Sequence, residues 1–311
     1  MILTALSGIS LFLGGIISVK KGFNFLYNKK LQKKLRLLTN NFLLAVFCGG
    51  LLTILIQSSS AALIIIIALL NSKLIDLKRA IGLMMGANVG TTFTLQLISF
   101  SLADYSFKLI IISSILFLSY LISRLAIIKS LAMVILGLAF IYQGIDLLEV
   151  IAIELKHSTL FINSVKAIVS YPLLSIPVGA FFTALIQSSS TFSGIIVILA
   201  KAGLIDLLTA VSFILGSNLG TCMTAVIAVA DNRNLSAFRL VFAHILFNIL
   251  GILLVVPILP VFIYVVSITA ISIEHQIANA HTLFNLATFV IIFSVKDYFI
   301  QLVKFIVTFD C

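Results

Sequence analysis

The chain consists largely of long apolar runs separated by short polar segments. Runs of about 18 to 20 apolar residues recur along the whole length, as expected of α-helices that cross a hydrocarbon core about 30 Å thick. The first run begins at Ile2 with no basic stretch before it and no small-residue cleavage site after it, so we interpret it as a retained span and not a signal peptide. The pattern predicts an all-α polytopic membrane protein.

Two of the apolar runs contain the same polar tetrad, QSSS. A shift of 130 positions aligns Thr53–Thr94 with Thr183–Thr224 without a gap, and 20 of the 42 aligned residues are identical. The identities concentrate in three places, which are 57–60 with 187–190, 74–77 with 204–207, and GANVGT (86–91) with GSNLGT (216–221). Because the polar and glycine positions are kept while most aliphatic ones differ, we infer an internal duplication.

Each QSSS tetrad lies near the middle of a segment that is too long for one span and too short for two. The segments cover about 40–71 and 170–200, which suits a re-entrant helical hairpin. We expect the serines to cap the second half-helix of each hairpin, and Asp76 and Asp206 to cap the helices that follow. The glycines of G-x-N-x-G-T predict that the next transmembrane helix is unwound there.

The distribution of charge bears on the topology. The chain is 61% hydrophobic and 10% charged, with 20 Lys and Arg against 10 Asp and Glu, and its mean hydropathy is +1.27. The basic residues fall in short segments between apolar runs, which marks cytoplasmic loops and argues against nucleic-acid binding. Re-entrant hairpins place fourteen basic residues inside and four outside, whereas fully spanning segments give twelve and six. The charges therefore favour two inverted-topology repeats.

The expected organisation has three parts: repeat 1 over 1–130, repeat 2 over 131–260, and C-terminal helices over 261–311. The cysteines Cys48, Cys222 and Cys311 are too widely spaced to suggest a disulfide or a zinc site. His244 and His281 each precede an asparagine by four residues. We expect interhelical hydrogen bonds from these pairs, with proton relay as the alternative.

The doubled motif resembles the sodium-dependent phosphate cotransporters of the Na/Pi type II family and their bacterial relatives. The fragments AHILFN (243–248) and AHTLFN (280–285) resemble that family's histidine–phenylalanine–asparagine helices. The resemblance implies two inverted repeats that hold phosphate and sodium at the hairpin tips and the unwound spans. Two features depart from the family: the sequence reaches Cys311 without a PhoU-like C-terminal domain, and Cys222 stands where the first copy has Thr92.

The residue chemistry indicates how such a site would work. The segments 37–72, 80–103, 167–200 and 207–230 contain no charged side chain, so helix N-termini and hydroxyls would have to hold an anion. The expected substrate ligands are Ser58, Ser59, Ser60, Ser188, Ser189, Ser190, Asn88, Thr91, Asn218 and Thr221. Neutral oxygens would bind sodium, and the expected sodium ligands are Gln57, Gln187, Thr92, Gly86 and Gly216.

These observations predict sodium-coupled uptake of inorganic phosphate across the cell (inner) membrane. A sodium- or proton-coupled carrier of another oxyanion, such as sulfate, remains the alternative. An intramembrane serine enzyme would need one asymmetric nucleophile–base pair, which equivalent serine triplets do not offer, so we expect no catalytic residue and no cofactor. The expected partners are phosphate, sodium ions and the lipid bilayer, and a homodimer and a separate PhoU-like regulator stay open.

Overall fold

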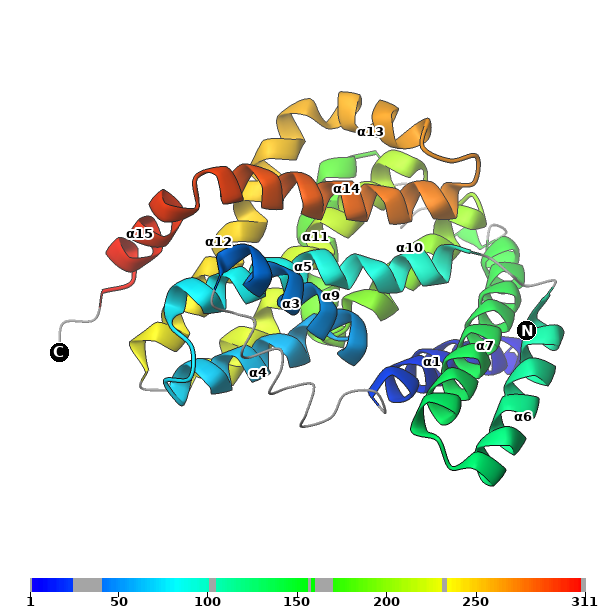
Figure 1. The fold of residues 1–311 in the computed structure, drawn as a ribbon. Coiled ribbons are helices and arrows are strands. Elements are labelled where there is room, and N and C mark those ends of the chain that lie inside the picture. Colours follow the sequence, from blue (N-terminus) through cyan, green and yellow to red (C-terminus); the bar gives the residue numbers. More distant parts are fainter. Residues whose placement is uncertain are drawn as a thin grey trace.

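The computed structural model describes residues 2–24, 41–100, 105–155, 158–159, 170–230 and 234–308. All regular elements within these ranges are helices (Figure 1). They are α1 (Ile2–Asn24), α3 (Phe42–Ile56), α4 (Ser59–Asn71), α5 (Leu77–Ser99), α6 (Ser106–Ser123), α7 (Ala126–Leu155), η2 (Pro172–Leu174), α9 (Ser175–Ile186), α10 (Ser189–Lys201), α11 (Leu207–Val229), α12 (Leu235–Val255), η3 (Val256–Ile258), α13 (Leu259–Ser267), α14 (Ile273–Ser294) and α15 (Lys296–Ile306).

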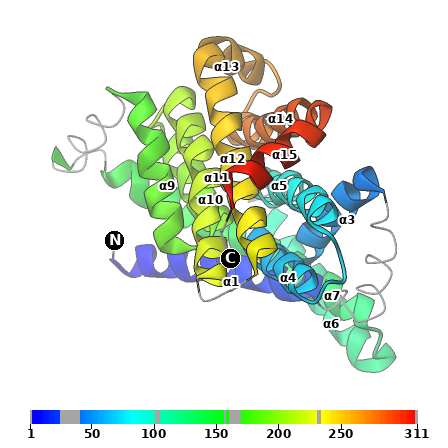
Figure 2. The ribbon, with the colours of Figure 1, turned by 90° about the vertical axis from the view of Figure 1, so that its left-hand side faces the viewer.

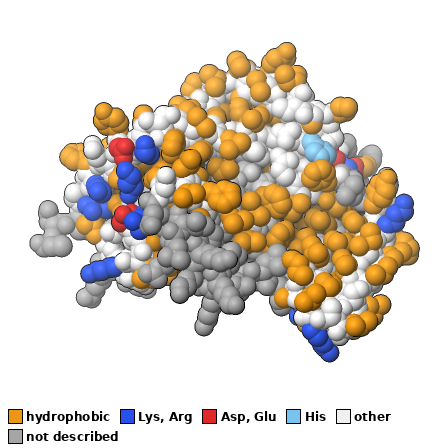
Figure 3. All heavy atoms as spheres, in the orientation of Figure 1, with side chains coloured by type: hydrophobic (Ala, Val, Ile, Leu, Met, Phe, Trp, Pro, Cys, Tyr) orange, Lys and Arg blue, Asp and Glu red, His pale blue; other side chains and the backbone are white. Residues whose placement is uncertain are grey.

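Seven helical segments of the described chain are long and apolar enough to cross a membrane. They are Leu3–Phe23, Leu77–Ser99, Ser106–Ser123, Ala126–Glu154, Leu207–Val229, Leu235–Ser267 and Ile273–Ser294. On the face drawn in Figure 3, hydrophobic side chains cover much of the described surface and charged side chains gather towards its left and right margins. The prediction of an all-α, multi-pass membrane protein is confirmed.

The first QSSS segment folds as two short helices joined at the tetrad. α3 has 15 residues and α4 has 13, and at about 1.5 Å per residue neither is long enough to span the hydrocarbon core. The start of α3 lies beside the start of α5, because the Phe42 carbonyl faces Gly82. α4 ends at Asn71, shortly before α5 begins. Both ends of this hairpin therefore lie at the same end of α5.

The second QSSS segment repeats these contacts 130 positions later. Gly86 on α5 faces the Val46 carbonyl of α3, and Gly216 on α11 faces the Ile176 carbonyl of α9. The lengths of α9 and α10, 12 and 13 residues, match those of the first hairpin closely. Figure 2 shows α3 and α9 on opposite sides of the molecule, with α12 between them.

Polar contacts at one end of the molecule show how the two copies are oriented. Lys78 Nζ lies 2.9 Å from Asp297 Oδ1, and Asn234 Nδ2 donates to Asn71 Oδ1 at 2.8 Å. The hydrogen bond from Lys78 lowers the pKa of the Asp297 carboxyl. α5 begins at this end, whereas α11 stops just before Asn234, so the two helices run in opposite directions.

The opposite directions of α5 and α11 support the inverted arrangement. The membrane side that each end faces stays a prediction, because most of the basic loop 20–36 and the loop residues 156–157 and 160–166 lie outside the described residues. The boundaries at 130/131 and 260/261 fall inside α7 and α13. They likewise stay a prediction.

The prediction that the spans unwind at 86–91 and 216–221 is wrong. α5 and α11 are continuous helices of 23 residues each. The glycines serve close packing instead: a Cβ at Gly86 or Gly216 would collide with the backbone of α3 or α9. Asp76 and Asp206 do cap these helices, accepting from the N–H of Arg79 at 2.8 Å and of Thr209 at 2.9 Å.

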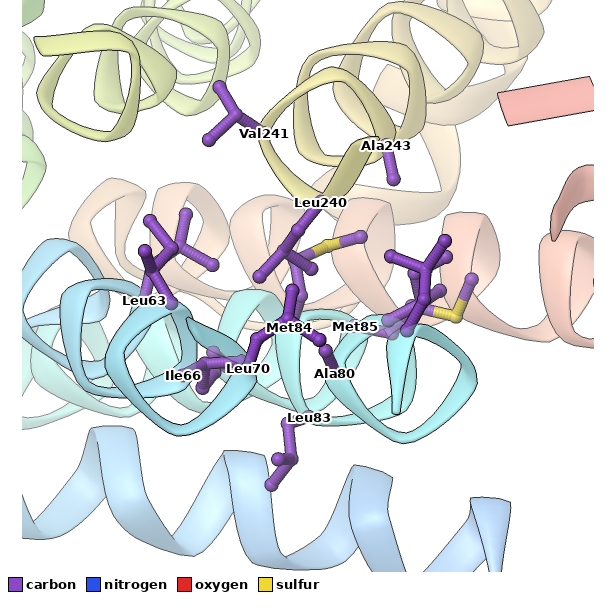
Figure 4. Packing of buried hydrophobic residues seen from close by; sticks show 14 of the residues in the cluster. Leu63, Ile66, Leu70, Ala80, Leu83, Met84, Met85, Leu240, Val241 and Ala243 are labelled. Carbon is purple, nitrogen blue, oxygen red and sulfur yellow. The ribbon is translucent and has the colours of Figure 1, made fainter. Parts of the chain in front are cut away.

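Two packing regions fix the positions of the hairpins. In the first, buried residues of α4, α5 and α12 interdigitate, including Leu63, Met84 and Leu240 (Figure 4). In the second, α1 packs along α7, where Gly15 lies against the Gly137 carbonyl. α1, α6 and α7 lie together at the lower right of Figure 1. One side of α1 lies next to the hairpin tips.

Candidate anion-binding site

A left-handed residue breaks the helix at both QSSS tetrads. Gln57 has φ 54° and ψ 34°, and Gln187 has φ 55° and ψ 28°. Their N–H groups donate to the carbonyls of Thr53 at 2.7 Å and Thr183 at 2.8 Å. A non-glycine residue in this region costs free energy that the surrounding structure must offset. The same strained conformation in both copies marks the breaks as specific features of the fold.

The serine that follows each glutamine caps the second half-helix, as the sequence predicts. Ser58 Oγ accepts from the N–H of Ala61, and Ser188 Oγ accepts from the N–H of Thr191, both at 3.3 Å. In an α-helix the first N–H groups have no carbonyl acceptor within the helix. The amides of Ser59 and Ser189, at the first positions of α4 and α10, are therefore available to an external acceptor.

The two tips line one shared pocket. The described residues around it are Lys20, Thr53, Gln57, Ser58, Ser59, Ser60, Thr91, Thr94, Gln187, Ser188, Ser189 and Ser190. The volume is about 20 Å³, which is enough for a water-sized group. A tetrahedral oxyanion is larger, so its binding requires the lining elements to move apart.

The two glutamines differ in environment although their backbones match. Gln57 is buried, its Oε1 accepts from Thr94 Oγ1 at 2.7 Å, and its Nε2 donates to the Ile54 carbonyl at 2.7 Å. Gln187 is exposed. The tip of the first hairpin also contacts the other half, since Ser60 Oγ donates to Thr224 Oγ1 at 3.3 Å. The pocket is therefore built from equivalent sequences but is not symmetric.

Six of the predicted ligands do not line the pocket: Asn88, Thr92, Asn218, Thr221, Gly86 and Gly216. The glycine carbonyls belong to continuous helices, where backbone carbonyls accept from the amide four residues later. Without unwinding they are not free for sodium. The hydroxyls of Thr92 and Thr221 donate to backbone carbonyls of their own helices at 2.8 Å.

The two asparagines bind histidines of the C-terminal half. Asn88 Oδ1 lies 3.1 Å from His244 Nε2, and Asn218 Oδ1 lies 3.1 Å from His281 Nε2. All four side chains are buried. The interhelical hydrogen bonds expected of the histidines are confirmed, and they join α5 to α12 and α11 to α14.

Sequence reasoning missed three residues of the pocket: Thr53, Thr94 and Lys20. The threonines carried a signal, since they are the first and last residues of the gap-free duplication. Lys20 carried no such signal, because it is the first residue of the basic loop 20–36 and resembles the other loop charges. Its presence puts a charged side chain at a pocket for which the sequence predicted only hydroxyls and helix ends.

The pocket offers hydroxyls, free amides and one ammonium to a ligand, and neither His244 nor His281 lines it. No group of three or more His, Cys, Asp or Glu side chains that could hold a metal ion occurs in the described part of the chain. Such a donor set suits a hydrogen-bonded oxyanion and an alkali cation held by neutral oxygens.

Comparison with known proteins identifies the family. The model of the Na+/Pi-cotransporter family matches residues 11–150 and 157–264. The chain belongs to the Na+/Pi-cotransporter family. It is therefore a multi-pass membrane protein of a transporter family. Both hairpins and the pocket fall within the matched ranges.

Individual relatives fit this assignment. The uncharacterized protein YqeW of Bacillus subtilis is 30% identical over 296 residues, which is 95% of each chain. Sodium-dependent phosphate transport protein 2A of Mus musculus is 36% identical over 131 residues, or 39% of this chain and 21% of the relative. Protein 2B of Homo sapiens is 32% identical over 157 residues, or 47% and 22%. The aligned part thus spans about a fifth of these mammalian relatives. No solved structure matches the chain significantly.

Proposed function

We propose that this member of the Na+/Pi-cotransporter family is a secondary active transporter that couples the uptake of inorganic phosphate across the inner membrane to sodium. The observation that carries the proposal is the shared pocket, in which the two QSSS tips from opposite halves of the chain meet. A site between two oppositely directed repeats is one of the arrangements that secondary transporters use for alternating access, in which one half moves against the other around the site.

The tips bind phosphate through hydrogen bonds. The pocket brings together the amides at the starts of α4 and α10 and the hydroxyls of both serine triplets, of which Ser60 already donates to Thr224. Helix N-termini also carry partial positive charge, which favours an anion. Tetrahedral phosphate presents acceptor oxygens in several directions, so donors from both halves can bind it at the same time.

Sodium is bound by neutral oxygens at the pocket margin. Gln187 is the best-placed amide, because its side chain is exposed and lines the pocket, whereas Gln57 Oε1 already accepts from Thr94. Among the described residues neither a carboxylate nor a histidine lines the pocket, so the side chains that usually relay protons in transporters do not occur there. This favours sodium over protons as the coupling ion.

Uptake of radiolabelled phosphate into proteoliposomes tests the proposal. We expect uptake at fixed pH to rise with an inward sodium gradient and to vanish when choline replaces sodium. Full uptake driven by a pH gradient alone would contradict sodium coupling. A tenfold excess of unlabelled sulfate should leave phosphate uptake largely intact, and strong inhibition would favour the alternative, a carrier of another oxyanion.

An intramembrane serine enzyme is a poorer account of the pocket. It would need a base beside one serine, and neither His244 nor His281 lines the pocket, because the two histidines contact Asn88 and Asn218 instead. A homodimer and a separate PhoU-like regulator remain open predictions.

A further inference from the structure

A single ionisable side chain breaks the equivalence of the two halves of the pocket. Among the described residues that line it, all but Lys20 are serine, threonine or glutamine. The position 130 residues further along is Val150, on α7. The positive charge is thus specific to the first half, and neither serine hairpin supplies it.

The packing of α1 places Lys20 at the pocket. Ile16 and Val19 are buried, and Lys20 lies one helical turn after Ile16 on the same side of the helix. Gly15 and Gly22 hold α1 close to the backbone of α7. A second, apolar cavity is lined by Lys20 together with Gln57 and Thr94. The lysine therefore lies next to the first hairpin tip.

Lys20 is half-buried and makes no ion pair or hydrogen bond with another described residue. Two other lysines, by contrast, have carboxylate partners: Lys201 Nζ lies 2.7 Å from Glu149 Oε2, and Lys78 pairs with Asp297. An ammonium withdrawn from water without a counter-ion is costly. A bound anion would supply the missing partner.

We propose that Lys20 is a direct ligand of the transported oxyanion and replaces part of the charge compensation that sodium would otherwise provide. The proposal rests on the proposed function, because it concerns the same pocket. Hydrogen bonds from the serines fix the geometry of the anion, and the Lys20 ammonium adds a charge-assisted bond. Removing that charge weakens anion binding and shifts more of the neutralisation onto sodium.

The competing explanation is that Lys20 extends its ammonium to the membrane surface, as lysines near helix ends do. Its neighbour Lys21 is exposed and does not line the pocket. Lys21→Gln is therefore a matched control that removes the same charge one residue away.

The test is equilibrium binding of radiolabelled phosphate and, separately, radiolabelled sulfate to the purified full chain across a range of sodium concentrations. We expect Lys20→Gln to raise the phosphate Kd roughly ten- to a hundred-fold and to raise the sodium concentration for half-maximal binding. Lys20→Arg should stay close to wild type because it keeps the charge. Lys21→Gln should leave both quantities unchanged, and thermal unfolding should show all variants folded.

The outcomes separate this inference from the proposed function. If the wild type binds phosphate and Lys20→Gln binds it with an unchanged Kd and sodium dependence, the role of Lys20 is refuted and the function stands. If the wild type binds sulfate but not phosphate, and Lys20→Gln weakens sulfate, the inference stands and the phosphate assignment falls. If the wild type binds neither anion, both are wrong.

Discussion

At the scale of single residues, identical sequence has produced two different environments. Gln57 and Gln187 share the left-handed backbone conformation and the hydrogen bond of their N–H groups. Only Gln57 is buried, and its amide oxygen holds the Thr94 hydroxyl. The first glutamine therefore contributes to stability, whereas the side chain of the second is exposed, as the proposed sodium site requires.

This difference predicts unequal effects of the two alanine substitutions. Gln57→Ala leaves the buried Thr94 hydroxyl without its acceptor, which costs about 1–3 kcal/mol and should lower the midpoint of thermal unfolding. Gln187→Ala should leave that midpoint unchanged and instead raise the sodium concentration for half-maximal phosphate binding. Equal thermal destabilisation by both substitutions would show that the asymmetry is absent in the protein.

The sequence predicted those residue features that depend on local chemistry. The caps by Ser58, Ser188, Asp76 and Asp206 follow from the preferences of serine and aspartate at helix starts. The burial of Gln57 and the approach of Lys20 could not be predicted, because they depend on how α1 packs against α7 and on which of its faces meets the hairpin tips.

At the scale of elements, the glycines explain how the hairpins are held. In each repeat the first half-helix of the hairpin packs closely against the following long helix, α3 against α5 and α9 against α11. The close contacts occur at glycines that correspond between the repeats: Gly49 and Gly179, Gly86 and Gly216, and Gly90 and Gly220. The aligned repeat showed that the last two of these pairs are kept but not why. Glycine permits both unusual dihedral angles and close backbone approach, and the structure uses the second property. The prediction of unwound helices assumed that the glycines were needed for unusual dihedral angles.

Close packing predicts that Gly86→Ala destabilises the protein. The added Cβ would overlap the Val46 carbonyl of α3, and overpacking of this kind costs about 1–3 kcal/mol. Gly216→Ala should behave alike against Ile176. Gly14→Ala is the control, since a Cβ there meets no atom within 4 Å. Thermal unfolding of the three variants checks this, and tolerance of Gly86→Ala together with Gly216→Ala would argue against the packing.

At the scale of the whole molecule, the tips of the two hairpins line one pocket, and the proposed arrangement has the hairpins entering from opposite ends. The duplication and the charge counts predicted this arrangement, and the opposite directions of α5 and α11 support it. The convergence of the tips was expected only from the family resemblance, because it depends on packing between the halves through α12 and α14.

The inverted arrangement predicts labelling from opposite sides of the membrane. Ser72 follows the first hairpin and Tyr171 precedes the second, and both are exposed. In a Cys311→Ser background, where Cys48 and Cys222 are buried, an impermeant maleimide should label Tyr171→Cys in intact cells. It should label Ser72→Cys only after the membrane is permeabilised. Labelling of both from the same side would exclude inverted hairpins.

The central claim is that both halves of the chain form a single anion site, and the stoichiometry and affinity of phosphate binding test it most directly. At saturating sodium the purified wild type should bind one phosphate per chain. Ser59→Ala and Ser189→Ala should each raise its Kd roughly ten- to a hundred-fold, and Asp76→Asn should not, since asparagine also caps a helix. Two phosphates per chain, or a serine variant with the wild-type Kd, would contradict the account.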